Sequence, residues 1–256
     1  MEYIIITGAS SGIGRQCAIQ LSKKYNLILC ARREEKLEET KSLCQNNDKH
    51  LIFTCDLSDV TSLEEKLVDF IKDKQITVNK FVHCAGALQM QPIKTVDVET
   101  IMNEFGTNLV SAALIVKILI NKRKNQSALD NVVFISSNIS NRGAKAFSIY
   151  SATKSGLDGL MRSLSVELAP KVRINSVLPG GIPTEMTKAI YEENGNSKEC
   201  LYPLGYGKPH YIADAVEFLL SDKSEWITGQ QIVVDGGRTI DLTEWLYFFI
   251  AEIKHI

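Results

Sequence analysis

Short apolar runs without alternation recur along this chain and restrict the folds that it can adopt. The runs Ile4–Ile6 and Val132–Ile135 are apolar at every position and do not alternate with polar residues. Strands with this pattern are buried on both faces, as in parallel sheets that helices cover on both sides. The strands expected on this basis are Tyr3–Thr7, Leu27–Ala31, Leu51–Cys55, Lys80–Cys84, Asn131–Ile135, Arg173–Val177 and Gln231–Val234.

Longer amphipathic stretches separate these runs and predict helices. Strands that alternate with helices are typical of an α/β chain, here a single doubly wound Rossmann-type domain whose seven-stranded parallel sheet has helices on both faces. No Pro/Ser-rich linker or internal repeat interrupts the pattern, so one domain over residues 1–241 is expected. The expected helices are Gly12–Lys24, Glu34–Gln45, Ser62–Lys72, Val98–Leu119, Tyr150–Leu168 and Ile212–Leu220.

The composition argues against several other classes of protein. A formal net charge of −1 gives no reason to expect nucleic acid or an anionic membrane as a partner. The six cysteines form no CxxC pair, which suits free thiols in a reducing compartment, and the four histidines show no metal-ligand spacing. The chain runs from Met1 into a strand without a signal-peptide pattern, and no apolar run reaches the roughly 18 residues of a membrane span. We therefore expect a cytoplasmic protein without a bound metal.

The segment Thr7–Gly14, with the sequence TGASSGIG, joins the first strand to the first helix. Gly8 allows a tight turn, Gly12 lets the main chain approach an anion, and Gly14 permits close packing of the helix on the strand. The unpaired amides at the helix start then face a phosphate group. We expect a pyrophosphate-binding turn, the alternative being a connection that uses glycine for its geometry alone.

Tyr150 and Lys154 are four residues apart, and Ser137 lies thirteen residues before the tyrosine. On a helix, side chains at this spacing are neighbours, so an ammonium group would stand beside a phenol. A positive charge favours phenolate and is expected to lower the tyrosine pKa from about 10. The pattern predicts an acid–base pair near neutral pH, although the same spacing also occurs on ordinary surface helices.

Together with Ser137, Tyr150 and Lys154, the TGxxxGxG spacing of Thr7–Gly14 resembles the pattern of the short-chain dehydrogenase/reductase family. Further matches follow in the family's order and cover nearly the whole chain. They are Asp56-Leu57 after the third strand, Ala85-Gly86 after the fourth, Asn108 in Thr-Asn-Leu, the PGxxxT turn Pro179–Thr184, and Ile227–Gly237 around the last strand.

The resemblance implies hydride transfer between the nicotinamide of a dinucleotide and a ketone or secondary alcohol. In that reaction Tyr150 is the general acid of reduction and Ser137 holds the carbonyl oxygen. Lys154 binds the nicotinamide ribose and lowers the tyrosine pKa, and Asn108 holds a water in a proton relay. The implied cofactor-binding residues are Gly8, Ser10, Ser11, Gly12, Ile13, Gly14, Arg32, Arg33, Asp56, Leu57, Ala85, Gly86, Tyr150, Lys154, Pro179, Gly180, Ile182 and Thr184.

Two departures from the family pattern bear on the site. The NNAG motif reads His83–Gly86 here, so both asparagines are missing, and we expect local stability to differ more than chemistry. His83 is interpreted as a hydrogen-bonded core residue, with a catalytic base as the alternative. The spacing to Tyr150 selects Ser137 for the active site and leaves Ser136 a structural role.

Arg32 and Arg33 follow the second strand, and no acidic residue occurs there before Glu34. In this fold an acidic residue at that point binds the adenosine ribose hydroxyl and repels a 2′-phosphate, whereas a guanidinium group binds phosphate in a bidentate manner. We therefore expect NADP (NADPH) as the cofactor, with NAD as the alternative. Two solvated arginines at a helix start are the plainer interpretation.

The segment Pro203–His210, followed by Ile212–Asp222, is most similar to the 3-oxoacyl-(acyl-carrier-protein) reductase branch. Lys171 could meet an acidic carrier protein, but Gln126–Asp130 adds no second positive charge and Tyr206 replaces the arginine usual in the branch. We therefore expect a reductase of a free biosynthetic ketone. The alternatives are a carrier-protein reductase of fatty-acid synthesis and a catalytically silent, cofactor-sensing regulator.

Two further segments have open roles. Thr184–Pro209 lies beyond the carboxyl end of a strand and predicts a flap over the substrate, with an ordinary surface loop as the alternative. Residues 242–256 form a C-terminal extension that packs either on its own domain or at a subunit interface. Because family members are mostly tetramers or dimers built on the helices of Asn108 and Tyr150, we expect a homotetramer or another homo-oligomer. The apolar stripe Leu109–Leu119 fits that assembly but could also face the sheet.

Overall fold

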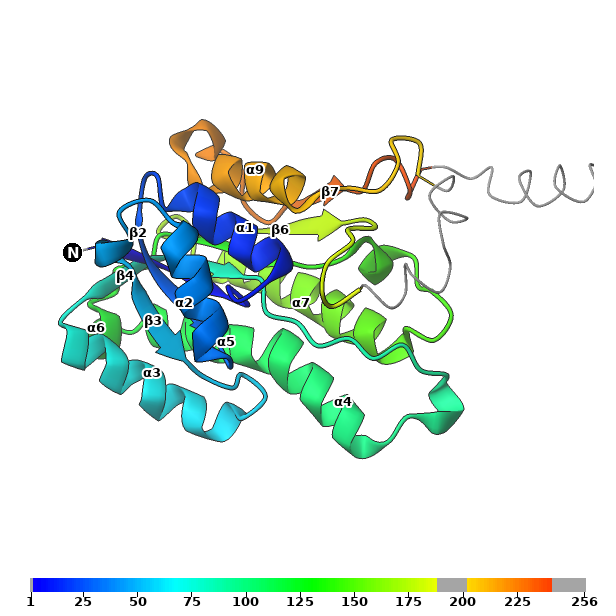
Figure 1. Ribbon diagram of the computed structural model, residues 1–256, viewed down its shortest axis with the longest axis horizontal. Coiled ribbons are helices and arrows are strands. Elements are labelled where there is room, and N and C mark those ends of the chain that lie inside the picture. The colour runs from blue at the N-terminus through cyan, green and yellow to red at the C-terminus, as the bar shows by residue number, and fades with distance from the viewer. Residues whose placement is uncertain (1, 188–201, 241–256) are drawn as a thin grey trace, which may run out of the picture.

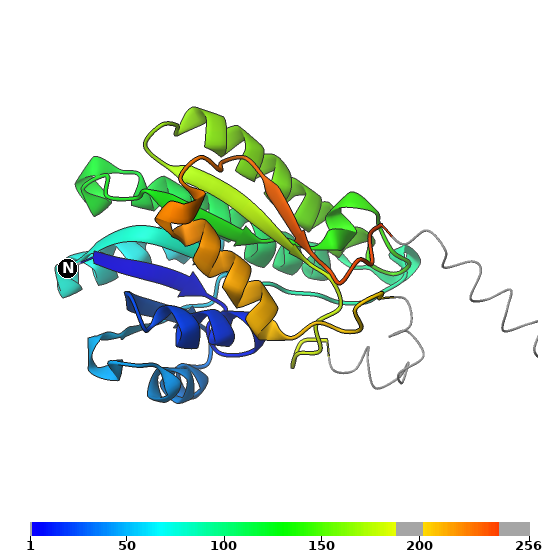
Figure 2. The same ribbon diagram turned by 90° about the horizontal axis from the view of Figure 1, so that it is seen from above.

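Within residues 2–187 and 202–240, which the computed structural model describes, seven strands form one sheet in the order β3-β2-β1-β4-β5-β6-β7. All neighbouring strands pair in parallel, which confirms the predicted doubly wound α/β sheet. Figure 2 shows β1 and β7 pointing toward the same edge of the sheet. The strands are β1 (Glu2–Thr7), β2 (Asn26–Ala31), β3 (Leu51–Thr54), β4 (Thr77–His83), β5 (Asn131–Ile135), β6 (Arg173–Pro179) and β7 (Gln231–Val234).

The non-alternating runs are buried on both faces of the sheet. In β1, Ile5 belongs to one hydrophobic core, whereas Ile4 and Ile6 belong to the other. In β5, Val132 and Phe134 face the first core, while Val133 and Ile135 face the second. An apolar side chain is therefore needed at every position, which explains why these strands do not alternate in polarity.

Helices cover the two faces of the sheet in two layers (Figure 1). Buried side chains of α1, α2 and α9 form one core, and those of α3, α5 and α7 form the other. The helices are α1 (Gly12–Leu21), α2 (Glu34–Leu43), α3 (Val60–Lys74), α4 (Val98–Phe105), α5 (Ser111–Leu119), α6 (Lys122–Asn125), α7 (Ser148–Glu167) and α9 (Pro209–Leu220). Short 3₁₀ turns occur at Asn47–Lys49, Ile93–Thr95, Asn138–Asn141 and Asp222–Ser224.

The stretch Val98–Leu119, predicted as one helix, is divided in the structure. A π-helical turn, Gly106–Val110, separates α4 from α5 and contains Asn108. The amide of Ser111 donates to the carbonyl of Gly106, five residues back, as a π turn requires. A hydrophobic period cannot show where a turn takes up one extra residue, so this division was not predictable from the pattern.

Among the described residues, none of the helices is long and apolar enough to cross a lipid bilayer. The predicted flap Thr184–Pro209 is described at Thr184–Thr187 and from residue 202 onward. Residues 188–201 and the extension 242–256 lie outside the described part of the chain.

Candidate active site

A cavity of about 630 Å³ lies at the carboxyl ends of the strands. It brings together residues from segments far apart in the sequence, as the fold predicts for a ligand site. Among the catalytic candidates, Ser137, Tyr150 and Lys154 line it, whereas Asn108 is not among its lining residues. Every residue predicted to bind the cofactor lines this cavity: Gly8, Ser10, Ser11, Gly12, Ile13, Gly14, Arg32, Arg33, Asp56, Leu57, Ala85, Gly86, Tyr150, Lys154, Pro179, Gly180, Ile182 and Thr184.

The turn between β1 and α1 has a conformation that requires glycine at two places. Gly8 has a φ of +68°, and a Cβ atom there would lie 2.8 Å from the amide nitrogen of Ala85. A Cβ atom on Gly14 would lie 2.2 Å from the carbonyl oxygen of Gly8, so any side chain would displace the turn. The start of α1 can therefore approach an anion through its main-chain amides.

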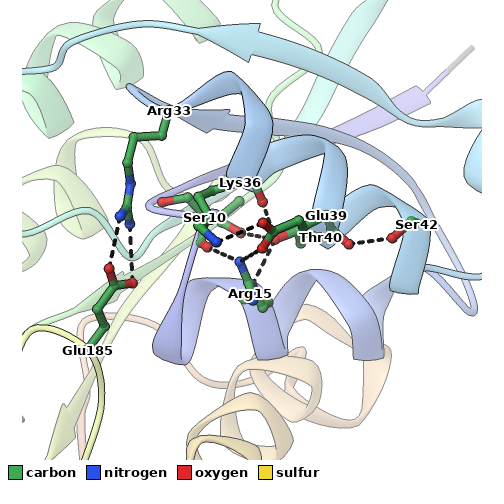
Figure 3. Close-up of polar contacts among 9 residues, drawn as sticks. Ser10, Arg15, Arg33, Lys36, Glu39, Thr40, Ser42 and Glu185 are labelled. Atoms are coloured by element: carbon green, nitrogen blue, oxygen red, sulfur yellow. Dashed lines mark hydrogen bonds and ion pairs between the residues drawn. The ribbon is translucent and has the colours of Figure 1, made fainter.

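The outer side of this turn is held by α1 and α2 (Figure 3). The Arg15 guanidinium donates to the carbonyl oxygen of Ser10 at 2.5 Å and to Thr40 Oγ1 at 3.0 Å. Thr40 Oγ1 in turn donates to the carbonyl of Ala9 at 2.9 Å. Because a side chain of α1 binds one carbonyl of the turn and a side chain of α2 binds the next, these contacts hold the turn in one orientation against the cavity.

The two arginines after β2 differ in their surroundings. Arg32 is 70% exposed, and its guanidinium makes a loose ion pair of 3.8 Å with Asp56. Arg33 instead makes a bidentate pair with Glu185, at 2.9 and 3.2 Å (Figure 3). Glu185 follows the turn after β6, so this pair joins the two sides of the cavity. Arg32 is the less constrained of the two cationic groups.

Ser137, Tyr150 and Lys154 meet where β5 ends and α7 passes over it. Ser137 and Lys154 are buried, and Tyr150 is half-buried. The Lys154 ammonium lies 5.7 Å from the centre of the Tyr150 ring and donates to the carbonyl of Ile135 at 2.8 Å. The predicted helical spacing therefore places the ammonium and the phenol side by side.

The expectation that Lys154 lowers the tyrosine pKa is wrong. Burial raises the pKa of Tyr150 to about 12, and the negative charge of Glu104 adds to this effect, although the hydrogen bond with Ser137 lowers it. Burial also lowers the pKa of Lys154 to about 8, against the opposing effect of Asp158. Desolvation therefore exceeds the effect of the Ser137 hydrogen bond at Tyr150 and that of the Asp158 charge at Lys154.

Asn108 is buried in the π turn, and its side chain contacts two other segments. Its Oδ1 atom accepts from the amide of Ala87 at 2.6 Å. Its Nδ2 group donates to the carbonyl of Ala87 and to Thr153 Oγ1, both at 2.9 Å. The side chain thus fixes the segment after β4 to α7, next to the lysine. These contacts use the Asn108 side chain, and the water that Asn108 is expected to hold in a proton relay stays a prediction.

His83 is fully buried at the end of β4 and is not among the residues that line the cavity. Its Nδ1 atom lies 2.9 Å from Thr7 Oγ1, which also accepts from the amide of Ala85 at 3.2 Å. Burial lowers its pKa to about 3, and the positive charge of Lys154 adds to this effect, against the opposing effect of the main chain of Asn108 and Thr107. A neutral histidine away from the cavity supports the interpretation as a core residue over that as a catalytic base.

Ser136 has the structural role that its spacing predicts. Its hydroxyl donates to Asp158 Oδ2 at 2.9 Å, and the same oxygen accepts from Ser140 Oγ at 2.7 Å. Asp158 is buried one helical turn after Lys154. This network connects the end of β5 to α7 and so helps to position the lysine.

The turn after β6 crosses the cavity and meets the glycine turn. A Cβ atom on Gly12 would lie 3.1 Å from Cγ2 of Thr184, so the two turns are in close contact. Thr184 is held by Thr187, whose Oγ1 accepts from the Thr184 amide at 2.9 Å. The predicted cofactor-contacting residues of the two turns therefore enclose one part of the cavity.

Sequence reasoning missed several residues of the site. Arg15 and Thr40 hold the glycine turn, Thr153 receives the Asn108 amide, and Glu104 and Glu185 line the cavity. Arg15 directly follows Gly14, and Thr153 directly precedes Lys154, so proximity to a motif was the one available signal. Glu185 directly follows Thr184 and so carries the same signal, whereas Thr40 carries none, because its contact with Arg15 depends on how α2 packs against α1.

The sequence has extensive similarity to known oxidoreductases. A family model described as enoyl-(acyl carrier protein) reductase matches residues 8–239. A 3-oxoacyl-[acyl-carrier-protein] reductase of Mus musculus is 34% identical over 235 residues, which cover 91% of this chain and 95% of that protein. Carbonyl reductase family member 4 of Xenopus laevis is 32% identical over 240 residues, covering 93% and 98%.

Solved structures show the same architecture. A short-chain dehydrogenase/reductase from Brucella melitensis superposes with a TM-score of 0.84 at 28% identity, covering 93% of this chain and 96% of that one. An actinorhodin polyketide ketoreductase with NADPH has a TM-score of 0.84 at 26% identity, covering 93% and 97%. A 4-hydroxyisoleucine dehydrogenase with NADH has a TM-score of 0.86 at 25% identity, covering 94% and 100%. The chain therefore belongs to the short-chain dehydrogenase/reductase family of oxidoreductases.

Proposed function

We propose that this protein is an NADP-dependent carbonyl reductase, which transfers a hydride between NADPH and a ketone of a biosynthetic pathway. One observation carries the proposal: a single cavity has the glycine turn at one part of its wall and Ser137, Tyr150 and Lys154 at another. A dinucleotide whose phosphates lie at the turn would extend toward the phenol. The proposed catalytic domain is residues 1–241.

The fit of a dinucleotide rests on the cradle at the start of α1. A side chain at Gly8 or Gly14 would overlap the main chain, so the turn keeps its amides near the cavity wall. When bound, the cofactor supplies or accepts the hydride. Asp56 and Leu57 would line the adenine end, Ala85 and Gly86 the middle, and the turn after β6 the nicotinamide end.

The protein itself would supply the proton that the carbonyl oxygen of the substrate needs. A pKa of about 12 keeps Tyr150 protonated at neutral pH, so its hydroxyl can donate a proton to a carbonyl oxygen that gains charge as it is reduced. The Ser137 hydroxyl would hold the same oxygen and stabilise that charge. A protonated phenol is the form that acts as the acid when a ketone is reduced.

Lys154 and Asn108 would position Tyr150 and help to return a proton to it after each reaction. The Lys154 ammonium is 5.7 Å from the phenol ring centre and would bind the nicotinamide ribose. Its pKa of about 8 lets it pass a proton to the phenol near neutral pH. The Asn108 side chain would act through Thr153, its partner on the same helix as the lysine.

The preference for NADP over NAD rests on Arg32. Its guanidinium is mostly exposed at the cavity wall, and its contact with Asp56 is long, so a phosphate could replace that contact. Arg33 would have to leave Glu185 to assist. No acidic residue precedes Glu34 after β2, which removes the usual basis for preferring NAD.

Reduction of a ketone carried on acyl carrier protein is the second candidate. It is supported by the similarity to 3-oxoacyl-[acyl-carrier-protein] reductases. Lys171 and Gln126–Asp130 directly precede β6 and β5, at the edge of the sheet opposite the cavity, so they provide no positive entrance to it for an acidic carrier protein. A catalytically silent sensor is the weaker alternative, since all of the side chains that the chemistry needs are present.

We further propose a homotetramer, or a dimer, in the cytoplasm. On α4, Val98 and Met102 are 73% and 64% exposed, and Val166 on α7 is 80% exposed, which suits burial against another copy. The cysteines at positions 17, 30, 44, 55 and 84 are free thiols, as expected in a reducing compartment. The extension 242–256 is assigned to packing on the domain or at a subunit interface.

Consumption of NADPH with a panel of free ketones, cyclic ketones, ketosugars and acyl thioesters tests the proposal. We expect turnover with at least one free ketone, and a loss of about 10³-fold or more in Tyr150→Phe while NADPH still binds. A Tyr150→Phe enzyme within a few-fold of the parent would refute the acid role. Binding of NADPH without turnover of any compound would favour the sensor.

A further inference from the structure

Glu104 is a buried carboxyl group in the wall of the cavity. It lies on α4, one helical turn before Asn108, and is 1% exposed. The remaining face of this short helix carries the exposed apolar residues Val98 and Met102. An acidic side chain thus points inward where an amphipathic helix would normally bury an apolar one.

The partners of Glu104 use little of its hydrogen-bonding capacity. Oε1 accepts from the amide of Gln89 at 2.7 Å. Oε2 is buried and has no hydrogen-bond partner, and no lysine or arginine within the described residues forms an ion pair with this carboxyl. Burial accordingly raises the pKa of Glu104, against the lowering effect of the Gln89 amide. An unsatisfied buried carboxyl group is destabilising, so a structural role alone does not explain it.

The position of Glu104 associates it with the substrate rather than with the cofactor. Leu88, Gln89 and Thr107 line the cavity next to it, and none of these matches a cofactor-binding position. Its negative charge also reaches Tyr150, the proposed acid. Glu104 therefore belongs to the end of the cavity where a ketone would extend beyond the phenol.

A carboxylate can only accept hydrogen bonds, and a protonated carboxyl group still accepts at one oxygen. A small rotation about the terminal side-chain bond, whose torsional profile is broad, would turn the unused oxygen toward a ligand. The complementary group on that ligand is a hydroxyl or a protonated amine. A plain hydrocarbon chain would leave the carboxyl without a partner.

We propose that Glu104 recognises a hydrogen-bond donor on the substrate, so that the preferred ketones carry a hydroxyl or a protonated amino group near the carbonyl. This inference rests on the proposed carbonyl reduction at Tyr150. It narrows the substrate to hydroxyketones and aminoketones and makes Glu104 a specificity-determining residue.

Three ketones of equal size test the inference: hydroxyacetone, protonated aminoacetone and 2-butanone. We expect the parent enzyme to favour a donor-bearing ketone by about tenfold or more in kcat/KM, the usual effect of a hydrogen bond to a charged group. Glu104→Leu should abolish that preference. Glu104→Gln should abolish preference for the amine while keeping much of that for the hydroxyl, which separates the two donors. Glu99→Gln, an exposed acidic position on the same helix, is the matched control and should change neither.

Equal kcat/KM values for the three ketones in the parent would overturn the inference. So would an equal loss for all three in Glu104→Leu, because that result would mean that Glu104 merely holds the Gln89 segment. Thermal stabilisation by the same ketones with oxidised NADP provides a readout without turnover. If nothing is reduced but stabilisation by a donor-bearing ketone depends on Glu104, the reductase proposal fails, and what is supported is the recognition of a hydrogen-bond donor by Glu104 alone. If no ketone stabilises the protein selectively, the inference fails.

Discussion

The ammonium group of Lys154 donates a hydrogen bond of 2.8 Å to the main-chain carbonyl of Ile135, the last residue of β5. The bond fastens α7 to the sheet beside the proposed acid. The Lys154 side chain is nevertheless a charged group in a residue that is 3% exposed, and burial lowers the pKa of its ammonium group to about 8. An amine with such a pKa is held at some cost to the fold.

Replacing this amine should therefore stabilise the protein while removing activity. In Lys154→Met, we expect the free energy of unfolding near pH 7 to rise by about 2 kcal/mol. The unfolded lysine binds a proton up to about pH 10.5, whereas the folded one releases it from about pH 8, so the stability of the parent increases across that window. The difference between the two proteins should shrink accordingly. Urea titrations near pH 7 and pH 10 measure the free energy of unfolding of both proteins. If the variant exceeds the parent by the same amount at both pH values, the lowered pKa of Lys154 is contradicted.

His83 should make the protein sensitive to acid. Its pKa is about 3 in the fold and about 6.5 in the unfolded chain, so stability is lost as the pH falls below about 6.5. In His83→Asn the amide oxygen can still accept from Thr7, but the titration is gone. Between pH 6.5 and 5 we expect the parent to lose about 2 kcal/mol more than the variant. His50→Asn is the comparison, since burial lowers the pKa of His50 as well. If the free energy of unfolding falls equally with pH in the parent and in His83→Asn, the prediction is refuted.

Arg32 should govern the choice of cofactor. We expect Arg32→Asp to weaken NADPH binding by about tenfold to a hundredfold and to change NADH binding much less, because one guanidinium–phosphate contact is lost. Fluorescence titration with both cofactors measures the two affinities. Arg33→Gln, which breaks the pair with Glu185, should have the smaller effect on NADPH. Equal weakening of both cofactors by Arg32→Asp would reject NADP as the preferred one.

Thr40 should be needed for cofactor affinity although it contacts no cofactor in the proposed arrangement. Thr40→Val keeps the shape but removes the hydroxyl that links Arg15 to the carbonyl of Ala9. We expect a several-fold higher KM for NADPH and a stability loss of about 1 kcal/mol. Ser42→Ala, on the same helix and exposed, is the control and should leave the KM unchanged. An unchanged KM in Thr40→Val would mean that the glycine turn keeps its conformation without the Thr40 hydroxyl.

Much of this arrangement could be predicted from the sequence because it depends on local rules. Runs such as Ile4–Ile6 require burial on both faces, and Tyr150 and Lys154 meet through helical spacing alone. Arg15 and Thr40 could not be paired in advance, since their contact depends on how α2 packs against α1. The inward position of Glu104 contradicts the amphipathic pattern of its helix. The pKa of Tyr150 was misjudged because its neighbours were known but its desolvation was not.

The π turn Gly106–Val110 makes the active site depend on length as well as on residue type. One residue corresponds to about 100° of rotation along a helix, so deleting a single position from the turn would swing Asn108 away from Thr153 and rotate α4 relative to α5. Every side chain could remain unchanged in identity and the contact would still be broken. In relatives of this protein, an aligned asparagine is thus evidence of the same contact with the helix of the lysine only where the helix around it has the same number of residues.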